Sequence, residues 1–382
     1  MSDSLDTVPG VFTYLDLLHQ HQGSDMFFSV GSPPHIKIEG HARPVGERAL
    51  QPGEVRQLAY QLMSPAQVTE FEREWEMNLA VSLPGSGRFR ANMYLQRGEV
   101  SMVVRLIKTN IPSLESLGLP PVLEKLALQD RGLILVVGAA GSGKSTTLAA
   151  MLDHRNAQRS GHIICIEDPI EFLHPHRRSI VDQREVGLDT HSFSAALRNV
   201  LREAPDVIML GEVRDADTMQ HALHYAETGH LCVATLHGTS ARHAIERVTR
   251  FFPDEARKQV LADLSQNLLA MVGQRLVPGI DHKRVAAVEL MLGTPHVRDL
   301  VLRDELHELK DAIENALEAG MCSFDQSLFR LVEANRVSLA DALRFADSRT
   351  DLALKVKLEH GFDGQDAERK VLRDAGSPTS GR

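Results

Sequence analysis

Residues 138–146 have the types and spacing that bind phosphate. They read Gly-Ala-Ala-Gly-Ser-Gly-Lys-Ser-Thr and match the phosphate-loop pattern GxxxxGK[ST] in full. Two of the glycines let backbone N–H groups turn inward around an anion, because no Cβ stands in the way. Lys144 can reach the β- and γ-phosphates of a nucleotide, and the Ser145 hydroxyl can ligate Mg²⁺. The pattern predicts a nucleoside triphosphate site made by Gly138, Ala139, Ala140, Gly141, Ser142, Gly143, Lys144, Ser145 and Thr146.

Two carboxylates follow apolar runs that are typical of buried strands. Residues 163–166 lead into Glu167, and residues 207–210 lead through Gly211 into Glu212. In an open parallel sheet, ligands bind beyond the carboxyl ends of the strands, so both acids are candidates for orienting or deprotonating a water. Glu212 has the place of a Walker B acid and is also a candidate for the metal site. The sequence leaves open which acid is the general base, and a polar turn is the alternative role for Glu167.

Two histidines flank a third apolar run, residues 231–235. His237 follows this run at the expected phosphate end and could sense the γ-phosphate. His230 precedes it, and a strand of this length spans roughly 20 Å, so His230 cannot easily reach the same phosphate in its own subunit. A structural role is the alternative for a lone histidine at a strand end.

Two arginines alternate with apolar residues in the first third of the chain. Arg88 and Arg90 are separated by Phe89, and a period of two puts both guanidinium groups on one face of a strand. One interpretation is a solvated strand face. The other is a pair of arginine fingers that neutralise charge on a transferred phosphoryl group. Arg97 and Arg105 are weaker candidates for the same role.

The composition limits the class of protein that positions these residues. The chain has 382 residues, enough for two or three domains, and its net charge of −9 disfavours a globally basic nucleic-acid binder. Its 3 cysteines form no CxxC pair, which fits a reducing compartment and predicts no structural zinc site. We find neither an apolar stretch of about 18 residues nor an N-terminal signal pattern. These features predict a cytoplasmic protein that meets a membrane only through partners.

The order of expected elements predicts two domains. Residues 1–107 mix short strands and helices, and residues 108–118 read as a linker around Asn110-Ile111-Pro112. From residue 119 to 358, apolar strands alternate with helices, which is typical of a parallel α/β core. The polar segment 359–382 is expected to be disordered.

Three stretches are expected to be helical throughout. They are residues 53–75, residues 254–272 with Gly273 as the stop signal, and residues 298–318 with Gly320 as the stop signal. The last two lead us to expect a helical region after residue 253.

The motifs together resemble the PilT/PilU type IV pilus retraction ATPases, within the wider type II/IV secretion ATPase superfamily. The resemblance covers roughly residues 12–358 and rests on short segments throughout the chain. They are GRFR at 87–90, the phosphate loop, IEDPIEF at 166–172, APDVIMLGEVRD at 204–215 and the block from ETGH at 227–230 to TLHGTSA at 235–241. NIP at 110–112, MCSFDQSLFRL at 321–331 and ADSRTDLALKVKL at 346–358 look more like the PilU branch than the PilT branch.

The resemblance implies an α/β protein with an N-terminal PAS-like α+β domain and a C-terminal RecA-like P-loop ATPase domain that ends in a helical region. It implies a homohexameric ring that binds ATP and Mg²⁺ at subunit interfaces. In such a ring Glu167 and Glu212 are the acid pair, His230 and His237 belong to the histidine motif, and Arg88 or Arg90 faces the nucleotide. The implied partners are an inner-membrane pilus platform protein and a paralogous retraction ATPase.

The main hypothesis is therefore a cytoplasmic ATPase that powers pilus retraction and twitching motility, alone or as an accessory to a paralogue. A pilus-assembly or type II secretion ATPase shares the fold, but its relatives usually carry a tetracysteine insert that this chain lacks. A conjugation-type DNA motor is a second alternative. A regulatory subunit that binds ATP but hydrolyses little is a third.

Overall fold

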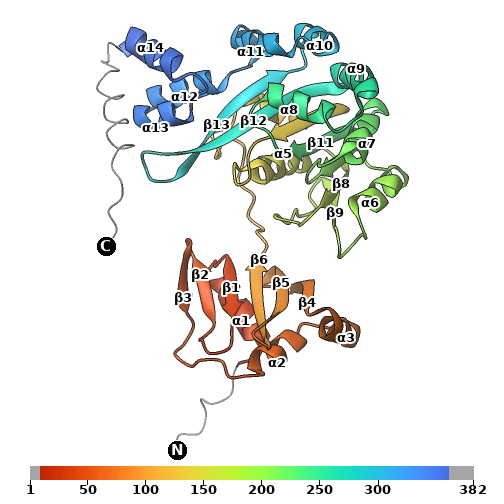
Figure 1. Cartoon of the computed structure of the whole chain (residues 1–382), viewed down its shortest axis with the longest axis vertical. Helices are drawn as coiled ribbons and strands as arrows, with labels where there is room; N and C mark the ends of the chain where they lie inside the picture. The colour runs from red at the N-terminus through yellow and green to blue at the C-terminus, as the bar shows by residue number, and fades with distance from the viewer. Residues whose placement is uncertain (1–8, 361–382) are drawn as a thin grey trace, which may run out of the picture. The chain divides into compact units, whose positions relative to one another are not determined.

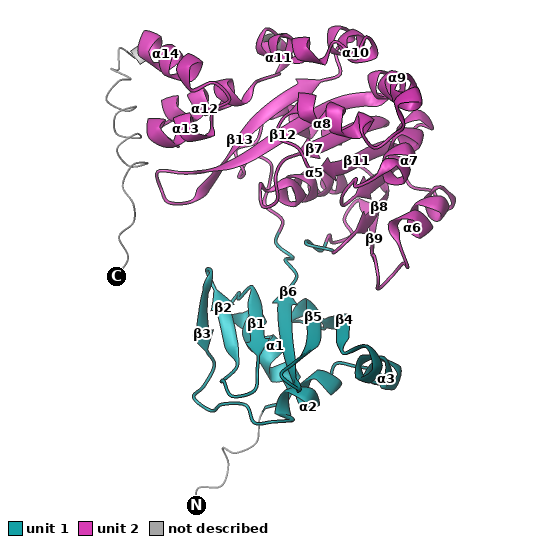
Figure 2. Ribbon diagram, in the orientation of Figure 1, with its two compact units in different colours: residues 1–110, 170–173 teal, residues 111–169, 174–382 magenta. Residues whose placement is uncertain are grey.

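The computed structural model describes residues 9–360, which divide into two compact units (Figure 1, Figure 2). Unit 1 contains the residues up to Asn110 together with residues 170–173, and unit 2 contains residues 111–169 and those from His174 onward. The boundary at residue 110 lies inside the segment 108–118 that the sequence marks as a linker. Residues 361–382 of the expected disordered tail lie outside the described residues.

Unit 1 is an antiparallel sheet with three helices. The strands have the order β3-β2-β1-β6-β5-β4. They are β1 (Asp25–Phe28), β2 (His35–Ile38), β3 (His41–Pro44), β4 (Glu76–Leu83), β5 (Gly87–Gln96) and β6 (Glu99–Leu106), and the helices are α1 (Val11–Gln20), α2 (Glu54–Tyr60) and α3 (Pro65–Glu74). Burial alternates along β5, since Phe89, Ala91 and Met93 lie in the core while the residues between them do not.

The helix expected over residues 53–75 is two helices. Ser64 accepts a hydrogen bond from the Gln67 backbone N–H, and the Gln67 side chain accepts one from the Ser64 N–H. This capping box, with Pro65 as the first helical residue, starts a new helix rather than continuing the old one. The prediction of one continuous helix was wrong because it gave the local start signal too little weight.

Unit 2 is built on a seven-stranded sheet with the order β13-β12-β7-β11-β10-β8-β9, in which only β13 runs antiparallel to its neighbour. The strands are β7 (Gly132–Val137), β8 (Gly161–Glu167), β9 (Ser179–Glu185), β10 (Val207–Leu210), β11 (Leu231–Leu236), β12 (Leu268–Pro278) and β13 (Arg284–Leu292). The longer helices are α4 (Val122–Ala127), α5 (Lys144–Gln158), α6 (Phe193–Val200), α7 (Ala216–Glu227), α8 (Ala241–Thr249), α9 (Arg257–Asn267), α10 (Pro295–Leu302), α11 (Leu309–Glu314), α12 (Phe324–Glu333), α13 (Leu339–Phe345) and α14 (Arg349–His360).

Helices cover both faces of this sheet, which explains the unbroken apolar runs of its strands. In β7, Leu133 and Leu135 belong to one hydrophobic cluster, whereas Ile134 and Val136 belong to another. The first cluster includes residues of α6 to α11, and the second includes residues of α4 and α5. All six residues of β7 are buried, so the phosphate loop starts from a rigid strand.

The two helices expected after residue 253 are confirmed only in part, because the first ends at Asn267 and the second is interrupted. Residues 268–272 are the start of β12, because this apolar run pairs with β7 on one side and β13 on the other. A short apolar run fits a buried strand as well as a buried helix, and only its pairing decides. The expected helix 298–318 is interrupted between α10 and α11 by η3 (Leu306–Glu308), after Asp304 takes a left-handed conformation with φ 61°.

The described helices include none that is long and apolar enough to cross a membrane.

Candidate functional site

The phosphate loop connects β7 to α5 and has the backbone that its sequence predicts. Gly141 and Gly143 have φ values of 74° and 88°, a region that L-residues with a Cβ rarely adopt. A Cβ at Gly143 would lie 2.8 Å from the side-chain nitrogen of Gln274, and one at Gly138 would overlap Ser142 Oγ. The glycines are therefore required both by conformation and by space.

Two polar side chains within the loop fit a phosphate ligand. The Lys144 ammonium is buried over the loop, where it donates to the carbonyl oxygens of Gly138 at 3.0 Å and Ala139 at 2.9 Å. Ser142 Oγ is buried and has no hydrogen-bond partner among the described residues. The 15-residue α5 begins at Lys144, so its positive end faces the same place. A loop with these donors can hold the phosphates of a nucleotide.

A glutamine that the sequence analysis missed supports the loop from β12. Gln274 is buried, and its side-chain oxygen accepts a hydrogen bond from Thr147 Oγ1 at 2.6 Å. Thr147 lies in the first turn of α5, so this bond ties the helix that follows the loop to the neighbouring strand. The only sequence signal is the pair of polar residues Gln274 and Arg275 inside the otherwise apolar run 268–277.

A pocket of about 250 Å³ opens beside the loop. Its wall consists of residues 139–142, the turn at Gly238 and Thr239, the β12 residues Gln274 to Leu276, Arg284 and Phe345. Two guanidinium groups, those of Arg275 and Arg284, line it and suit it to an anionic ligand. Neither arginine was predicted, because Arg275 lies just beyond the stretch 254–272 that was expected to be helical and no strand was expected at Arg284.

The strand-end acids and His237 lie on neighbouring strands beside the loop. The order β7-β11-β10-β8 is parallel throughout, so the carboxyl ends of these four strands share one edge of the sheet. Glu212 Oε1 lies 2.8 Å from His237 Nε2, and Arg214 Nε donates to Glu212 Oε2 at 2.8 Å. Arg214 also donates to Asp168 at 3.1 Å. The arginine hydrogen bond to Glu212, followed by the nearby carboxylates, raises the pKa of Arg214 above its usual value.

Glu167 lies at the end of β8 and is almost fully buried. Gln183 of β9 donates to its Oε1 at 2.9 Å. Gly211, in place of a Walker B aspartate, lets the ends of β8 and β10 approach closely, since a Cβ there would lie 3.2 Å from Glu167 Cα. The Gly211 N–H donates to the Ile166 carbonyl at 2.8 Å, so the two strands stay paired up to the acids.

His230 lies at the opposite edge of the sheet. The register pairs Leu231 with Gly132, where β7 begins, and Leu236 with Val137, where the phosphate loop begins. The His230 ring contacts Thr228 Oγ1 and the Tyr225 carbonyl, at 3.2 and 3.3 Å. The structure does not bring His230 together with the phosphate loop of its own chain.

The two candidate arginines share one face of β5 in unit 1. Arg90 donates to the Ile170 carbonyl at 2.9 Å, and Ile170 belongs to the short segment 170–173 that follows the strand-end acids in sequence. Lys108 and Phe172 form a bridge within the same unit. Arg105, a weaker candidate, is ion-paired with Asp25 at 2.7 Å.

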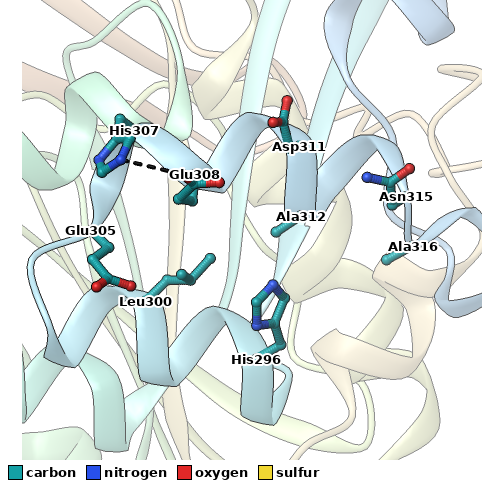
Figure 3. Close-up of a pocket in the computed structure, with 9 residues that line it drawn as sticks. All are labelled: His296, Leu300, Glu305, His307, Glu308, Asp311, Ala312, Asn315 and Ala316. Atoms are coloured by element: carbon teal, nitrogen blue, oxygen red, sulfur yellow. Dashed lines mark ion pairs between the residues drawn. The ribbon is translucent and has the colours of Figure 1, made fainter.

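A second pocket lies between α10 and α11 and contains none of these residues (Figure 3). It has a volume of about 610 Å³, with His296 and Leu300 on α10, Glu305 on the connection that follows α10, and His307 and Asp311 among the residues of the other side. Within residues 9–360, no group of three or more histidine, cysteine, aspartate or glutamate residues is placed to hold a metal ion.

A glycine-rich loop between a buried strand and a helix, with a glutamate–histidine pair at neighbouring strand ends, defines a nucleotide-binding P-loop ATPase. The chain belongs to the type II/IV secretion system protein family, whose model matches residues 36–326. It is 50% identical to the type IV pilus ATPase PilU of Pseudomonas aeruginosa over 90% of each chain. It is 42% identical to the type IV pilus retraction ATPase PilT of the same organism, over 84% of this chain and 93% of PilT.

A crystal structure of the pilus retraction motor PilT with bound ADP has a TM-score of 0.83 to this structure at 38% identity. The match covers 90% of this chain and 99% of that chain. The resemblance to the PilT/PilU group and the mixed α/β fold class are confirmed. The roles of individual site residues stay predictions.

Proposed function

We propose that this chain is the Mg²⁺-dependent ATPase of a type IV pilus machine and that it powers pilus retraction. The observation that carries the proposal is the 50% identity to PilU over 90% of each chain, which includes the whole phosphate site. The chain acts as a homohexameric ring at the cytoplasmic face of the inner membrane, where it meets a pilus platform protein. The platform and a paralogous retraction ATPase are its proposed partners.

Each site residue has a role that its position supports. Lys144 and the loop amides hold the phosphates of ATP, and Ser145, the second residue of α5, holds Mg²⁺ with Glu212 nearby. The bound metal ion would neutralise charge on the phosphates. Glu212 and Glu167 orient the attacking water or accept its proton, and His237 is placed against Glu212 to sense the γ-phosphate.

A deletion strain tests the proposal directly. We expect it to carry excess surface pili and to lose twitching, because pili that assemble are no longer withdrawn. The wild-type gene restores both, whereas Lys144→Ala does not; Lys125→Ala, at an exposed position of α4, is the matched control and should restore both. Bald cells would instead indicate a pilus-assembly ATPase, and an unchanged strain would contradict any motor function.

The resemblance of the C-terminal segments to the PilU branch supports an accessory role beside a paralogue. ATP hydrolysis separates the two forms of the proposal when it is measured for the purified chain alone and for the chain mixed with the retraction ATPase of the same organism. An autonomous motor hydrolyses ATP alone, whereas an accessory subunit shows low turnover alone and raises the force or rate of the mixture.

A further inference from the structure

One arginine of β12 joins the turn that follows β11 to the C-terminal helices. Arg275 Nη2 donates to the Thr239 carbonyl at 3.2 Å and to Asp347 Oδ1 at 2.6 Å. Its Nη1 donates to the Phe345 carbonyl at 2.7 Å. The guanidinium also lies 3.8 Å from the centre of the Phe324 ring, a stacking contact that a lysine ammonium does not reproduce.

A buried glutamate holds the other end of the same turn. Glu289 of β13 accepts a hydrogen bond from the Ala241 N–H, the first residue of α8, at 2.5 Å. The register pairs Gly273 with Glu289, so Glu289 and Arg275 lie on the same face of the sheet. Gly273 leaves room for this arrangement, since a Cβ there would lie 3.0 Å from the Phe324 ring.

The partner of Arg275 is itself held in place by the C-terminal helices. Asp325, in the first turn of α12, accepts hydrogen bonds from the backbone N–H of Asp347 at 2.7 Å and of Ser348 at 3.0 Å. These bonds fix the turn between α13 and α14 and aim the Asp347 carboxylate at Arg275. Burial of Asp325 raises its pKa, and the two N–H donors oppose that effect.

We propose that Arg275 is a positioning residue for ATP hydrolysis. Its hydrogen bonds to Thr239 and Asp347 couple the position of the turn that carries His237 to the position of helices α12 to α14. The turn begins at His237, whose ring is paired with Glu212, and ends at Ala241, which Glu289 holds. A displacement of the C-terminal helices therefore reaches the strand-end histidine through one guanidinium group. Any partner that moves these helices changes the rate of hydrolysis.

The test compares Arg275→Lys and Asp347→Asn in the full-length protein. Both weaken the arginine–aspartate link and should lower kcat about tenfold. For Asp347→Asn, which does not line the pocket beside the phosphate loop, KM for ATP should change less than threefold. The double variant should be no slower than either single variant, since both break the same link. Arg344→Lys, which is exposed on α13 and 3.9 Å from its own aspartate, is the matched control and should keep parental rates.

Hydrogen exchange distinguishes positioning from a general structural role. We expect Asp347→Asn to speed exchange in the peptide covering residues 237–241, to which Asp347 is linked by hydrogen bonds through Arg275, without a change in the peptide covering α5. Parental kcat and parental exchange at 237–241 in Asp347→Asn would overturn the proposal. Because Asp347 lies outside the sheet, this variant keeps the test decisive even if Arg275→Lys fails to fold.

Discussion

At the scale of single residues, the site consists of side chains that are held in place before any ligand contact. Glu212 touches both His237 and Arg214, so its carboxylate has little freedom. Lys144 is fixed by two carbonyl oxygens of its own loop. For Glu212, such preorganisation means that removing its charge should affect the rate of chemistry more than the binding of ATP.

Glu212→Gln tests this expectation. The amide keeps the shape of the side chain, but it cannot act as a base and it lacks the negative charge that attracts Mg²⁺. We expect kcat to fall by about 10²- to 10⁴-fold while a fluorescent ATP analogue still binds within about threefold of the parental affinity. Glu246→Gln on α8, which removes an ion pair with Arg242, is the control. A variant with nearly parental turnover would remove Glu212 from the chemistry.

Glu289 provides a prediction about pH. Burial raises its pKa from 4.5 to about 7, with a further increase from Asp347 and opposing effects of the Ala241 N–H, Arg275 and Lys310. Because the folded protein holds this proton more tightly than the unfolded chain does, the stabilisation is complete below pH 4.5 and is lost as the pH rises through 7. This difference between the unfolded and folded pKa values corresponds to about 3 kcal/mol in the free energy of unfolding.

Thermal melts of Glu289→Gln measure this contribution. The parental melting temperature should fall relative to that of the variant between pH 5 and pH 8, by on the order of 5 °C. Titrations elsewhere in the chain affect both proteins alike, so the difference isolates Glu289. If the melting temperatures of the two proteins change in parallel between pH 5 and pH 8, Glu289 is ionised throughout this range.

At the scale of elements, the site depends on how closely the ends of β8 and β10 approach. The Gly211 N–H bonds to the Ile166 carbonyl, and its own carbonyl accepts from Thr235 Oγ1 of β11 at 2.5 Å. One glycine therefore joins three strands just before the acidic residues. A side chain at this position must push two of these strands apart.

Gly211→Ala should lower both stability and activity. The added Cβ would lie 3.2 Å from Glu167 Cα and 3.3 Å from the Ile166 carbonyl, and neither backbone atom can rotate away. We expect the free energy of unfolding, measured by denaturation, to fall by about 1–3 kcal/mol. We also expect a marked fall in kcat for ATP hydrolysis. Gly10→Ala is the control, because its Cβ would meet only the end of the Gln61 side chain. A Gly211→Ala variant that is as stable and as active as Gly10→Ala would contradict the packing argument.

At the scale of the whole molecule, the candidate residues are divided between two units. The phosphate loop and the strand-end acids belong to unit 2, whereas Arg88, Arg90 and the segment 170–173 belong to unit 1. Under the proposed ring, an arginine of one protomer completes the nucleotide site of another. This arrangement makes hydrolysis a property of the assembly.

Mixing two inactive variants tests that arrangement. Arg90→Ala and Lys144→Ala should each lose most ATP hydrolysis, by about 10³-fold for a lost arginine finger. When the two are dissociated and reassembled together, part of the activity should return, because a Lys144→Ala protomer supplies its intact Arg90 to the intact loop of a neighbour. Activity that does not return in verified mixed rings would place Arg90 outside the neighbouring site.

The local sequence determined the parts of the site that are contiguous in the chain. The phosphate loop was predictable because one stretch of nine residues supplies the turn, the donors and the start of the helix. The positions of Glu167, Glu212 and His237 were predictable because each lies just after an apolar run, and parallel strands bring such ends to one edge. The family could be inferred from the same short motifs.

Only the tertiary structure decided what depends on distant pairing. Residues 268–272 are apolar enough for a helix or a strand, and their pairing with β7 and β13 settles the choice. Thr147 and Gln274 are 127 residues apart in sequence, and no local pattern indicates their hydrogen bond. The same holds for Arg275 and Glu289, because a side chain's partners across a sheet are set by register, which forms only when the whole sheet assembles.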